Sequence, residues 1–288
     1  MRSLLFVPAD GGPKLDKAMA SGADAVIVDL EDSIVPERKE AARKLALEFL
    51  KTHAAKKDRP RLLIRINGLD TGMTDADLDA IVPGKPDVIL FPKAEGGATV
   101  THVDAKLTAR EAIAGLPEGS IKILAQTVES AMGLFTAGSY RNCSARLIGM
   151  TWGPEDLSAE LGAEANREAD GTLTEPYRLA RSFCLYGAAA AKVPAIETIH
   201  VNFRDAEVLR RDTELARRDG FTGRLAIHPA QVSVINAVFT PGVEQIERAK
   251  AIVAAFAAKP GAGAVAIDGK MYDRPHLARA QALLARIG

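Results

Sequence analysis

Short apolar runs rich in β-branched residues recur along most of the chain, and each is followed by a polar loop and a segment of helical periodicity. The runs are continuous rather than alternating, which is typical of strands buried on both faces of a parallel sheet. Eight of them are expected to be strands, at residues 3–7, 25–30, 62–66, 88–91, 121–125, 146–150, 196–201 and 224–227. Eight strands alternating with helices predict an α/β fold, the TIM (β/α)8 barrel.

The segments between these runs carry apolar residues at helical spacing. In the segment PERKEAARKLALEFLKTH, the stripe expected to face the core consists of Ala41, Leu45, Leu47 and Leu50. Pro36 suits the first turn of this helix, because the N–H that proline lacks would have no partner there.

The chain continues beyond the eighth run. Residues 1–238 are expected to form the barrel, and residues 239–288 a C-terminal helical extension that serves as a lid and contacts a neighbouring subunit. A break at Thr240-Pro241-Gly242 separates two helices, and Pro275 begins a last one. A barrel of about 250 residues with such an extension matches the total length.

Composition and charge exclude several classes of protein. Lys and Arg number 37 and so do Asp and Glu, so net charge gives no reason to expect nucleic acid or a membrane surface as a partner. Cys143 and Cys184 form no CxxC pair, which argues against a disulfide framework and a zinc site. No apolar run has the length of a signal-peptide core or a membrane span, so a cytoplasmic location is expected.

Acidic residues stand at the ends of several apolar runs, notably Glu31, Asp32, Glu129 and Asp156. Carboxylates placed repeatedly after buried strands are costly unless a positive charge lies among them. The loops that follow barrel strands build the active site, so the fold itself would bring Glu129 and Asp156 together. Two carboxylates completed by waters and substrate oxygen suit Mg²⁺, and the lack of a histidine cluster argues against zinc or iron.

Each of these residues also has a structural interpretation. Glu129 and Asp156 could stabilise the first turn of a helix. Arg65, inside an apolar strand, could bind a carboxylate or carbonyl oxygen of a ligand, or form a buried ion pair with Asp29 or Glu31. His228 is expected to cap a helix or orient a loop. Covalent hydrolase and nucleotide-hydrolysing activities are disfavoured because GxSxG, Walker A and GxGxxG motifs are absent from the sequence.

Eight ordered sequence blocks resemble the citrate lyase β-subunit family of the HpcH/HpaI aldolase superfamily, close to the malyl-CoA and citramalyl-CoA lyases. They are RSLLFVPAD, DAVIVDLEDSIVPERKEAAR, IRINGLDTG, ILFPKAE, TVESAMGL, GPEDLSAELG, GRLAIHPAQV and GKMYDRPHLARAQ. Two positions depart from the family pattern: Pro8-Ala9 stands where Pro-Gly is usual, and Glu197 where aspartate is common.

The resemblance implies a role for each matching residue. It implies that Glu129 and Asp156 bind Mg²⁺ (or Mn²⁺) and that Arg65 contacts the α-keto acid, with Glu31 and Asp32 ordering the site. In the malyl-CoA branch a tail aspartate reaches a neighbouring protomer and serves as acid/base, and Asp273 occupies that motif. Residues expected to contact substrate or coenzyme A are Lys14, Gly153, Pro154 and Glu155, with a solvated surface role as the alternative for Lys14.

The function that the resemblance implies is Mg²⁺-dependent carbon–carbon cleavage, or formation, of a β-hydroxyacyl-CoA thioester, giving an α-keto acid and an acyl-CoA. The expected substrates are malyl-CoA, citramalyl-CoA or a citryl thioester, and the expected assembly is a homotrimer or a multiple of one. Two alternatives remain: a metal-dependent aldolase acting on free hydroxy-keto acids, and a citrate lyase β-subunit that depends on an acyl-carrier partner.

Overall fold

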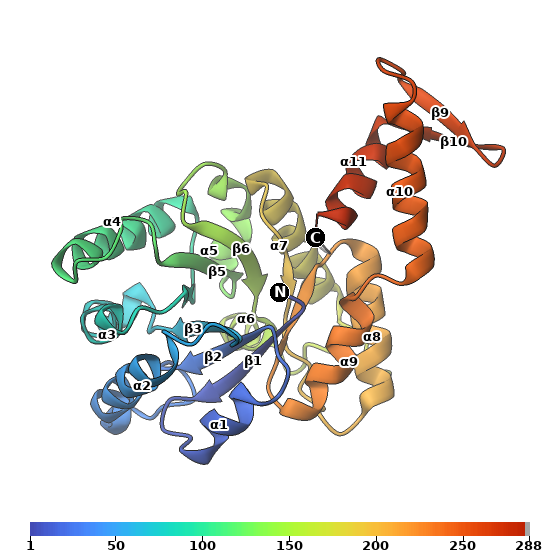
Figure 1. The fold of residues 1–288 in the computed structure, drawn as a ribbon. Helices are drawn as coiled ribbons and strands as arrows, with labels where there is room; N and C mark the ends of the chain where they lie inside the picture. Colours follow the sequence, from blue (N-terminus) through green and yellow to red (C-terminus); the bar gives the residue numbers. More distant parts are fainter. Residues whose placement is uncertain (286–288) are drawn as a thin grey trace. The chain divides into compact units, whose positions relative to one another are not determined.

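A ring of eight parallel strands surrounded by helices forms the larger part of the chain in the computed structural model, which describes residues 1–285 (Figure 1). The TIM barrel predicted from the sequence is confirmed. The strands are β1 (Ser3–Pro8), β2 (Ala25–Asp29), β3 (Arg61–Arg65), β4 (Val88–Phe91), β5 (Lys122–Val128), β6 (Leu147–Trp152), β7 (Ile196–Glu197) and β8 (Gly223–Ala226).

The strands follow one another around the ring in the order β6-β5-β4-β3-β2-β1-β8-β7. A parallel bridge between Met150 on β6 and Ala195, just before β7, joins the two ends of this series. Within the ring Asp29 is the register partner of Arg65. This pairing places the two side chains on the same face of adjacent strands at the same height.

Strand β7 is shorter than the predicted run of residues 196–201, and that part of the prediction is wrong. The Glu197 carboxylate accepts the Thr198 N–H at 2.9 Å, and this bond takes a donor that would otherwise continue the sheet. Glu197 also accepts hydrogen bonds from Trp152 Nε1 and Arg181 Nε, each at 2.6 Å. The glutamate that departs from the family pattern therefore has a local packing role.

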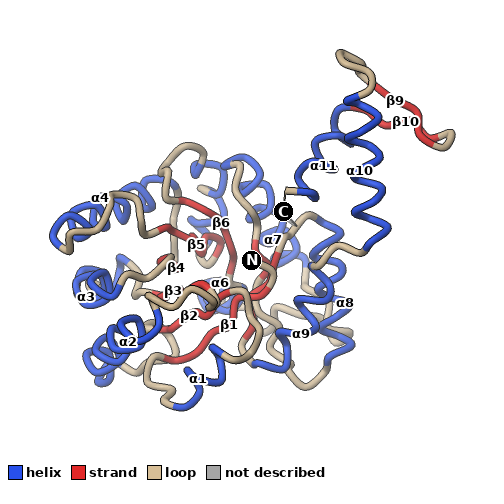
Figure 2. Tube along the Cα trace, viewed as in Figure 1, coloured by secondary structure: helices blue, strands red, loops and turns tan. Residues whose placement is uncertain are grey.

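The helices lie outside the ring of strands, and loops join them to the strand ends (Figure 2). In the barrel they are α1 (Pro13–Met19), α2 (Lys39–His53), α3 (Thr74–Ile81), α4 (Gly97–Ile113), α5 (Ala131–Phe135), α6 (Pro154–Leu161), α7 (Glu175–Ala191), α8 (Ala206–Asp219) and α9 (Pro229–Phe239). Cys143 and Cys184 are both free thiols, as predicted. Nowhere in residues 1–285 does a helix have the length and apolarity needed to cross a membrane.

The predicted stripe of α2 is partly wrong. Ala42, Ala46, Phe49 and Leu50 are buried, whereas Leu45 is 37% exposed. The helix buries small alanines next to the barrel, because their size lets the helix pack closely, and leaves a larger leucine at its edge. A preceding 3-10 turn, Pro36–Arg38, begins at the proline as expected.

Two apolar layers hold the barrel together. Inside the ring, alternate strand residues such as Leu4, Ile27, Leu63 and Leu90 form one cluster. The residues of opposite parity, such as Val26, pack outward against the helices. Because side chains alternate between the two faces of a strand, the inward positions near the carboxyl ends of the strands point into the mouth of the barrel.

The chain divides into two compact units, Met1–Phe239 and Thr240–Gly288. The second contains α10 (Val243–Ala257), the hairpin β9 (Ala264–Ile267) and β10 (Lys270–Asp273), and α11 (Arg274–Leu284). Its own small core includes Ile252, Phe256, Val265 and Tyr272. The predicted helical extension also contains a hairpin that the sequence analysis did not anticipate, and its turn residues Asp268 and Gly269 have φ values of 51° and 74°. An Asp-Gly pair is a strong hairpin signal.

A buried ion pair stabilises the barrel at the amino-terminal end of β6. Glu111 on α4 contacts Arg146 at 2.7 Å and accepts the N–H groups of Gly119 and Ile121 at 2.9 and 2.8 Å. Burial opposes ionisation of Glu111, but these partners outweigh it and lower its pKa to about 2. The ionised side chain therefore stabilises the fold above about pH 4.5, and this contribution is lost as the pH falls towards 2.

We expect Glu111→Gln to lower the free energy of unfolding by about 1–3 kcal/mol at neutral pH, because a charge-assisted hydrogen-bond network is lost. The deficit should shrink as the pH falls from 4.5 towards 2. Urea unfolding at a series of pH values measures it, with Glu118→Gln on the exposed loop that follows as the matched control. A deficit that stays constant with pH would contradict this assignment.

Candidate active site

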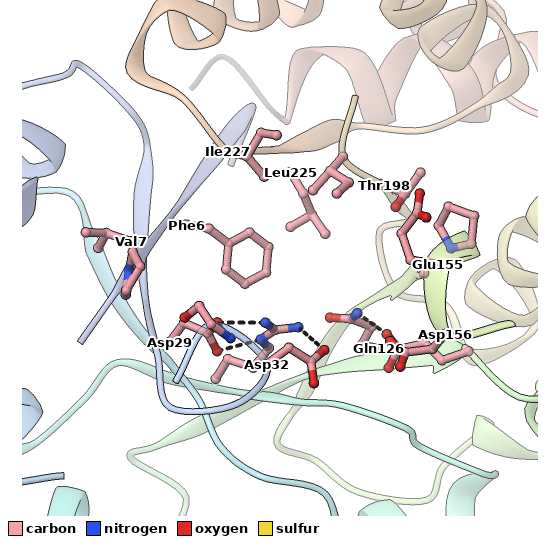
Figure 3. A pocket seen from close by; sticks show the side chains of 17 residues that line it. Phe6, Val7, Asp29, Asp32, Gln126, Glu155, Asp156, Thr198, Leu225 and Ile227 are labelled. Atoms are coloured by element: carbon pink, nitrogen blue, oxygen red, sulfur yellow. Dashed lines mark hydrogen bonds and ion pairs between the residues drawn. The ribbon is translucent and has the colours of Figure 1, made fainter. Parts of the chain in front are cut away.

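The inward side chains change from apolar to polar at the carboxyl ends of the strands. Asp29, Arg65 and Gln126 follow apolar inward residues on β2, β3 and β5, and with loop residues they line a cavity of about 340 Å³ (Figure 3). Its lining also includes Phe6, Val7, Pro8, Asp32, Ser33, Glu129, Gly153, Pro154, Glu155, Asp156, Thr198, Ile199, Leu225 and Ile227. The mouth of the barrel therefore holds the candidate site.

Arg65 is held in place by carboxylates on both sides. Its Nε and Nη2 donate to the two Asp29 oxygens at 2.7 Å each, and Nη1 lies 2.8 Å from Glu31 Oε2. The guanidinium also lies over the ring of Phe6, 4.9 Å from its centroid. The ion-pair interpretation of Arg65 is therefore confirmed, and the same side chain lines the cavity.

These contacts change the protonation of both partners. Burial opposes ionisation of Asp29, but hydrogen bonds and charge from Arg65 hold the pKa of Asp29 below its usual value. The pKa of Arg65 is raised in turn, because Asp29 and Glu31 outweigh the cost of burying it. Both groups are charged at neutral pH, and the guanidinium has a fixed orientation at the cavity.

Glu129 follows β5 directly and is only 2% exposed. One of its oxygens accepts the Lys93 N–H at 2.7 Å, and the other bonds Gln126 Nε2. Helix α5 is capped by Ser130, whose hydroxyl accepts the Gly133 N–H at 3.0 Å, so the helix-start interpretation of Glu129 is wrong. Burial, followed by the negative charges of Asp156 and Glu31, raises the pKa of Glu129 well above its usual value.

Asp156 lies beside Glu129 although the two are 27 positions apart in the sequence. Both line the same cavity, so the prediction that the fold brings them together is confirmed. Asp156 also sits in the first turn of α6, after the N-cap Gly153. Its helix-start role and a ligand role are compatible, because the carboxylate is one-third exposed and reaches the cavity.

Lys93 is one of the polar residues that the sequence places at the carboxyl ends of the strands, and it adds a cation to the site. Its Nζ lies 2.8 Å from Glu31 Oε1 and 3.4 Å from Asp156 Oδ1, and its backbone has a φ of 48°. That left-handed conformation is uncommon for a residue with a side chain and is often found at functional sites. The available signal was a lysine directly after a buried strand, in ILFPKAE.

Lys39 was missed entirely, because it lies in a helix whose other lysines face solvent. Its ammonium is buried and donates to the Leu30 and Glu31 carbonyls and to Asn67 Oδ1, at 2.7–2.8 Å. These bonds fix the loop that carries Glu31 and Asp32. Glu31 is buried and Asp32 is exposed at the cavity rim.

The remaining predicted residues lie in different places. Gly153, Pro154 and Glu155 line the cavity, whereas Lys14 is exposed on α1 and lies outside the cavity lining. Asp273 belongs to the C-terminal unit, where it caps α11 and bonds His276. This bond lowers the pKa of Asp273.

His228 has the structural role that the sequence indicated. Its Nδ1 accepts the Ala230 N–H at 3.2 Å at the start of α9, and its ring stacks on Phe203 at a centroid distance of 4.7 Å. Within residues 1–285, no three histidine, cysteine, aspartate or glutamate side chains gather in an arrangement able to hold a metal by themselves. Any cation here would need ligands from water or substrate in addition to Glu129 and Asp156.

A (β/α)8 barrel with buried charges at the carboxyl ends of its strands defines an enzyme of the TIM-barrel class. Residues 2–229 match the family described as HpcH/HpaI aldolase/citrate lyase, and residues 175–287 match the family described as C-C bond lyase of the TIM-barrel fold. The chain belongs to the HpcH/HpaI aldolase/citrate lyase family and is a carbon–carbon lyase.

Named relatives cover nearly the whole chain. The citrate lyase subunit beta of Leuconostoc mesenteroides subsp. cremoris is 34% identical, over 98% of this chain and 92% of its own length. A (3S)-malyl-CoA thioesterase of Cereibacter sphaeroides is 35% identical, over 99% of this chain and 94% of its own. The structure of CitE from Mycobacterium tuberculosis with magnesium, acetoacetate and coenzyme A is 32% identical. It has a TM-score of 0.77 and covers 99% of this chain and 97% of that one.

The burial of Glu31 generates a pH-dependent prediction. Burial raises the pKa of Glu31 to about 7, although the charges of Arg65 and Lys93 act in the opposite direction. The protonated form of Glu31 is thus favoured in the folded state. The stability that this form contributes is lost as the pH rises from about 4.5 to about 7. Glutamine has no charge to bury, so Glu31→Gln should lack this loss.

We expect the stability of Glu31→Gln relative to the natural protein to rise by roughly 1–3 kcal/mol between pH 4.5 and 7.5. Urea unfolding in buffer with a chelator measures the difference at each pH. Glu118→Gln, on an exposed loop, is the control and should show no such trend. A difference that is flat or falls with rising pH would show that Glu31 is ionised throughout.

Proposed function

We propose that the protein is a Mg²⁺-dependent lyase that cleaves or forms a β-hydroxyacyl-CoA thioester, with an α-keto acid and an acyl-CoA on the other side of the reaction. The observation that carries this proposal is the pair Glu129 and Asp156, which shares one cavity with the fixed guanidinium of Arg65. A keto acid carries a carboxylate and a carbonyl oxygen. The two protein carboxylates suit a cation that binds these oxygens, and the neighbouring guanidinium suits the carboxylate of the keto acid.

The residues present fit a magnesium ion. Glu129 has a pKa that burial and neighbouring carboxylates raise, so a divalent charge between it and Asp156 would relieve that repulsion. Gln126, which bonds Glu129, has a buried Oε1 with no hydrogen-bond partner among the described residues. Such an acceptor suits a donor brought by a hydrated cation or substrate. Mg²⁺ commonly uses only one or two carboxylates and keeps several waters.

Magnesium would supply Lewis acidity towards the carboxylate and carbonyl oxygens of the keto acid. The side chains of this chain supply the rest. Arg65, oriented by Asp29 and Glu31, would place positive charge at the substrate oxygen that changes between hydroxyl and carbonyl. Glu31 and Asp32 would order the solvent at the cavity, and Gly153, Pro154 and Glu155 would contact the bound substrate.

The proton transfer is assigned to Asp273. The Asp273 carboxylate would remove the α-proton of an acyl thioester in condensation and return it in cleavage. We propose that the C-terminal unit brings Asp273 to the site of a neighbouring protomer, in a homotrimer or a multiple of one. Lys14 is proposed to meet coenzyme A phosphates from the first loop.

A direct assay tests this function against its alternatives. Purified protein with Mg²⁺ should cleave malyl-CoA or citramalyl-CoA, with the keto acid trapped and measured, and chelation should abolish the activity. Turnover of free hydroxy-keto acids without coenzyme A would indicate the aldolase alternative. Turnover only with an acyl-carrier partner would indicate a citrate lyase β-subunit, which is the name of the Leuconostoc relative.

Gly153→Ala tests the position of the Glu129 carboxylate. A Cβ at residue 153 would lie 2.5 Å from Glu129 Oε1, so the carboxylate must move. We expect Mg²⁺ affinity measured by calorimetry to fall about tenfold or more, the range for disturbed ligand orientation. Gly138→Ala, where a Cβ meets nothing within 4 Å, should bind as the natural protein does. Equal affinities in both variants would exclude Glu129 as a ligand.

Asp273→Asn tests the proton transfer. Asparagine also caps helices well, so α11 should keep its start while the carboxylate is lost. We expect turnover to fall by about 10² to 10⁴, the usual contribution of general acid–base catalysis, with Mg²⁺ affinity unchanged. Asp268→Asn in the nearby hairpin turn is the control. Full turnover in Asp273→Asn would remove this residue from the mechanism.

A further inference from the structure

One wall of the cavity is apolar. Phe6 from β1 and Leu225 and Ile227 from the end of β8 lie on the side opposite Asp29, Asp32 and Gln126 (Figure 3). Leu225 is also part of the apolar cluster inside the barrel, so this wall continues the core up to the mouth. A ligand that spans the cavity therefore meets charge on one side and hydrocarbon on the other.

The cavity has little positive charge to offer a second anionic group. Arg65 is the only cationic side chain among the described residues that line it. Its Nε and Nη2 are occupied by Asp29, and its Nη1 lies 2.8 Å from Glu31 and 3.7 Å from Asp32. Five carboxylates line the same cavity, those of Asp29, Asp32, Glu129, Glu155 and Asp156.

Lys93, which lines an adjoining cavity, does not change this excess of negative charge. That cavity shares Glu129 and Asp156 with the first. The Lys93 ammonium lies 2.8 Å from Glu31 Oε1 and within 4 Å of Asp32 and Asp156. It is thus already surrounded by carboxylates, on the polar side of the site.

Building on the proposed function, we infer that the keto acid half of the substrate carries one carboxylate and a short apolar substituent, as pyruvate does, and not a second carboxylate as in oxaloacetate. One carboxylate is served by the cation site and Arg65. A second would face either the apolar wall or the five carboxylates, and neither placement offers it a cationic partner. A methyl group in the same place would pack on Phe6, Leu225 and Ile227.

Three keto acids test this inference on the natural protein. Calorimetry in saturating Mg²⁺ should show pyruvate binding at least about tenfold more tightly than oxaloacetate, because the unpaired carboxylate is rejected. Pyruvate should also bind several-fold more tightly than glyoxylate, since one methyl contact is worth about tenfold in an apolar pocket. Condensation with acetyl-CoA should follow the same order in kcat/KM.

Each result separates this inference from the proposed function. Oxaloacetate bound or turned over as well as pyruvate would overturn the inference and leave the lyase function intact. Glyoxylate preferred over pyruvate would overturn the role of the apolar wall. No Mg²⁺-dependent binding of any keto acid would overturn both the inference and the proposed function.

A charge placed on the apolar wall provides the variant test. Ile227 is 38% exposed, so Ile227→Lys can keep its ammonium hydrated while it reaches the cavity. We expect the oxaloacetate-to-pyruvate ratio of kcat/KM to rise about tenfold or more in this variant. Ile113→Lys, at a residue 86% exposed on α4, adds the same charge elsewhere and should leave the ratio unchanged. An unchanged ratio in a folded Ile227→Lys variant would contradict the assignment of this wall.

Discussion

Crowding of buried carboxylates at one end of the barrel is the constraint on which the rest of the site depends. Asp29, Glu31 and Glu129 are nearly inaccessible to solvent, where an unpaired negative charge is expensive. Arg65 neutralises Asp29 and lies 2.8 Å from Glu31, whose pKa burial raises to about 7. Among residues 1–285, the Glu129 carboxylate accepts hydrogen bonds from the Gln126 amide and the Lys93 backbone N–H and has no ion-pair partner within 4 Å. A divalent cation beside Asp156 would complete the charge balance that protein groups leave unfinished.

The barrel produces this arrangement through its register. Asp29 and Arg65 are register partners on adjacent strands, so their pairing follows from the sheet itself. Glu129 comes from the loop after β5 and Asp156 from the first turn of α6, which follows β6, and these two strands are neighbours in the ring. A fold that brings all strand ends to one opening lets residues far apart in sequence act together. The apolar wall from β1 and the end of β8 lines the same opening.

The sequence predicted the eight strands well, because continuous apolar runs separated by helical segments are a strong signal. It also predicted the meeting of Glu129 and Asp156, since strand order alone implies it. Local chemistry was harder to predict. Ser130 rather than Glu129 caps α5, which only the backbone geometry reveals. Lys39 was not predicted, because its bonds to two loop carbonyls and to Asn67 leave no local pattern in the sequence.

The central claim is that Glu129 and Asp156 hold a divalent cation facing Arg65, and a crystal structure with Mn²⁺ in place of Mg²⁺ tests it most directly. Manganese prefers the same oxygen ligands and is located by its anomalous scattering. We expect one strong anomalous peak bonded to both carboxylates inside the cavity. A peak elsewhere, or a site formed without either carboxylate, would contradict it.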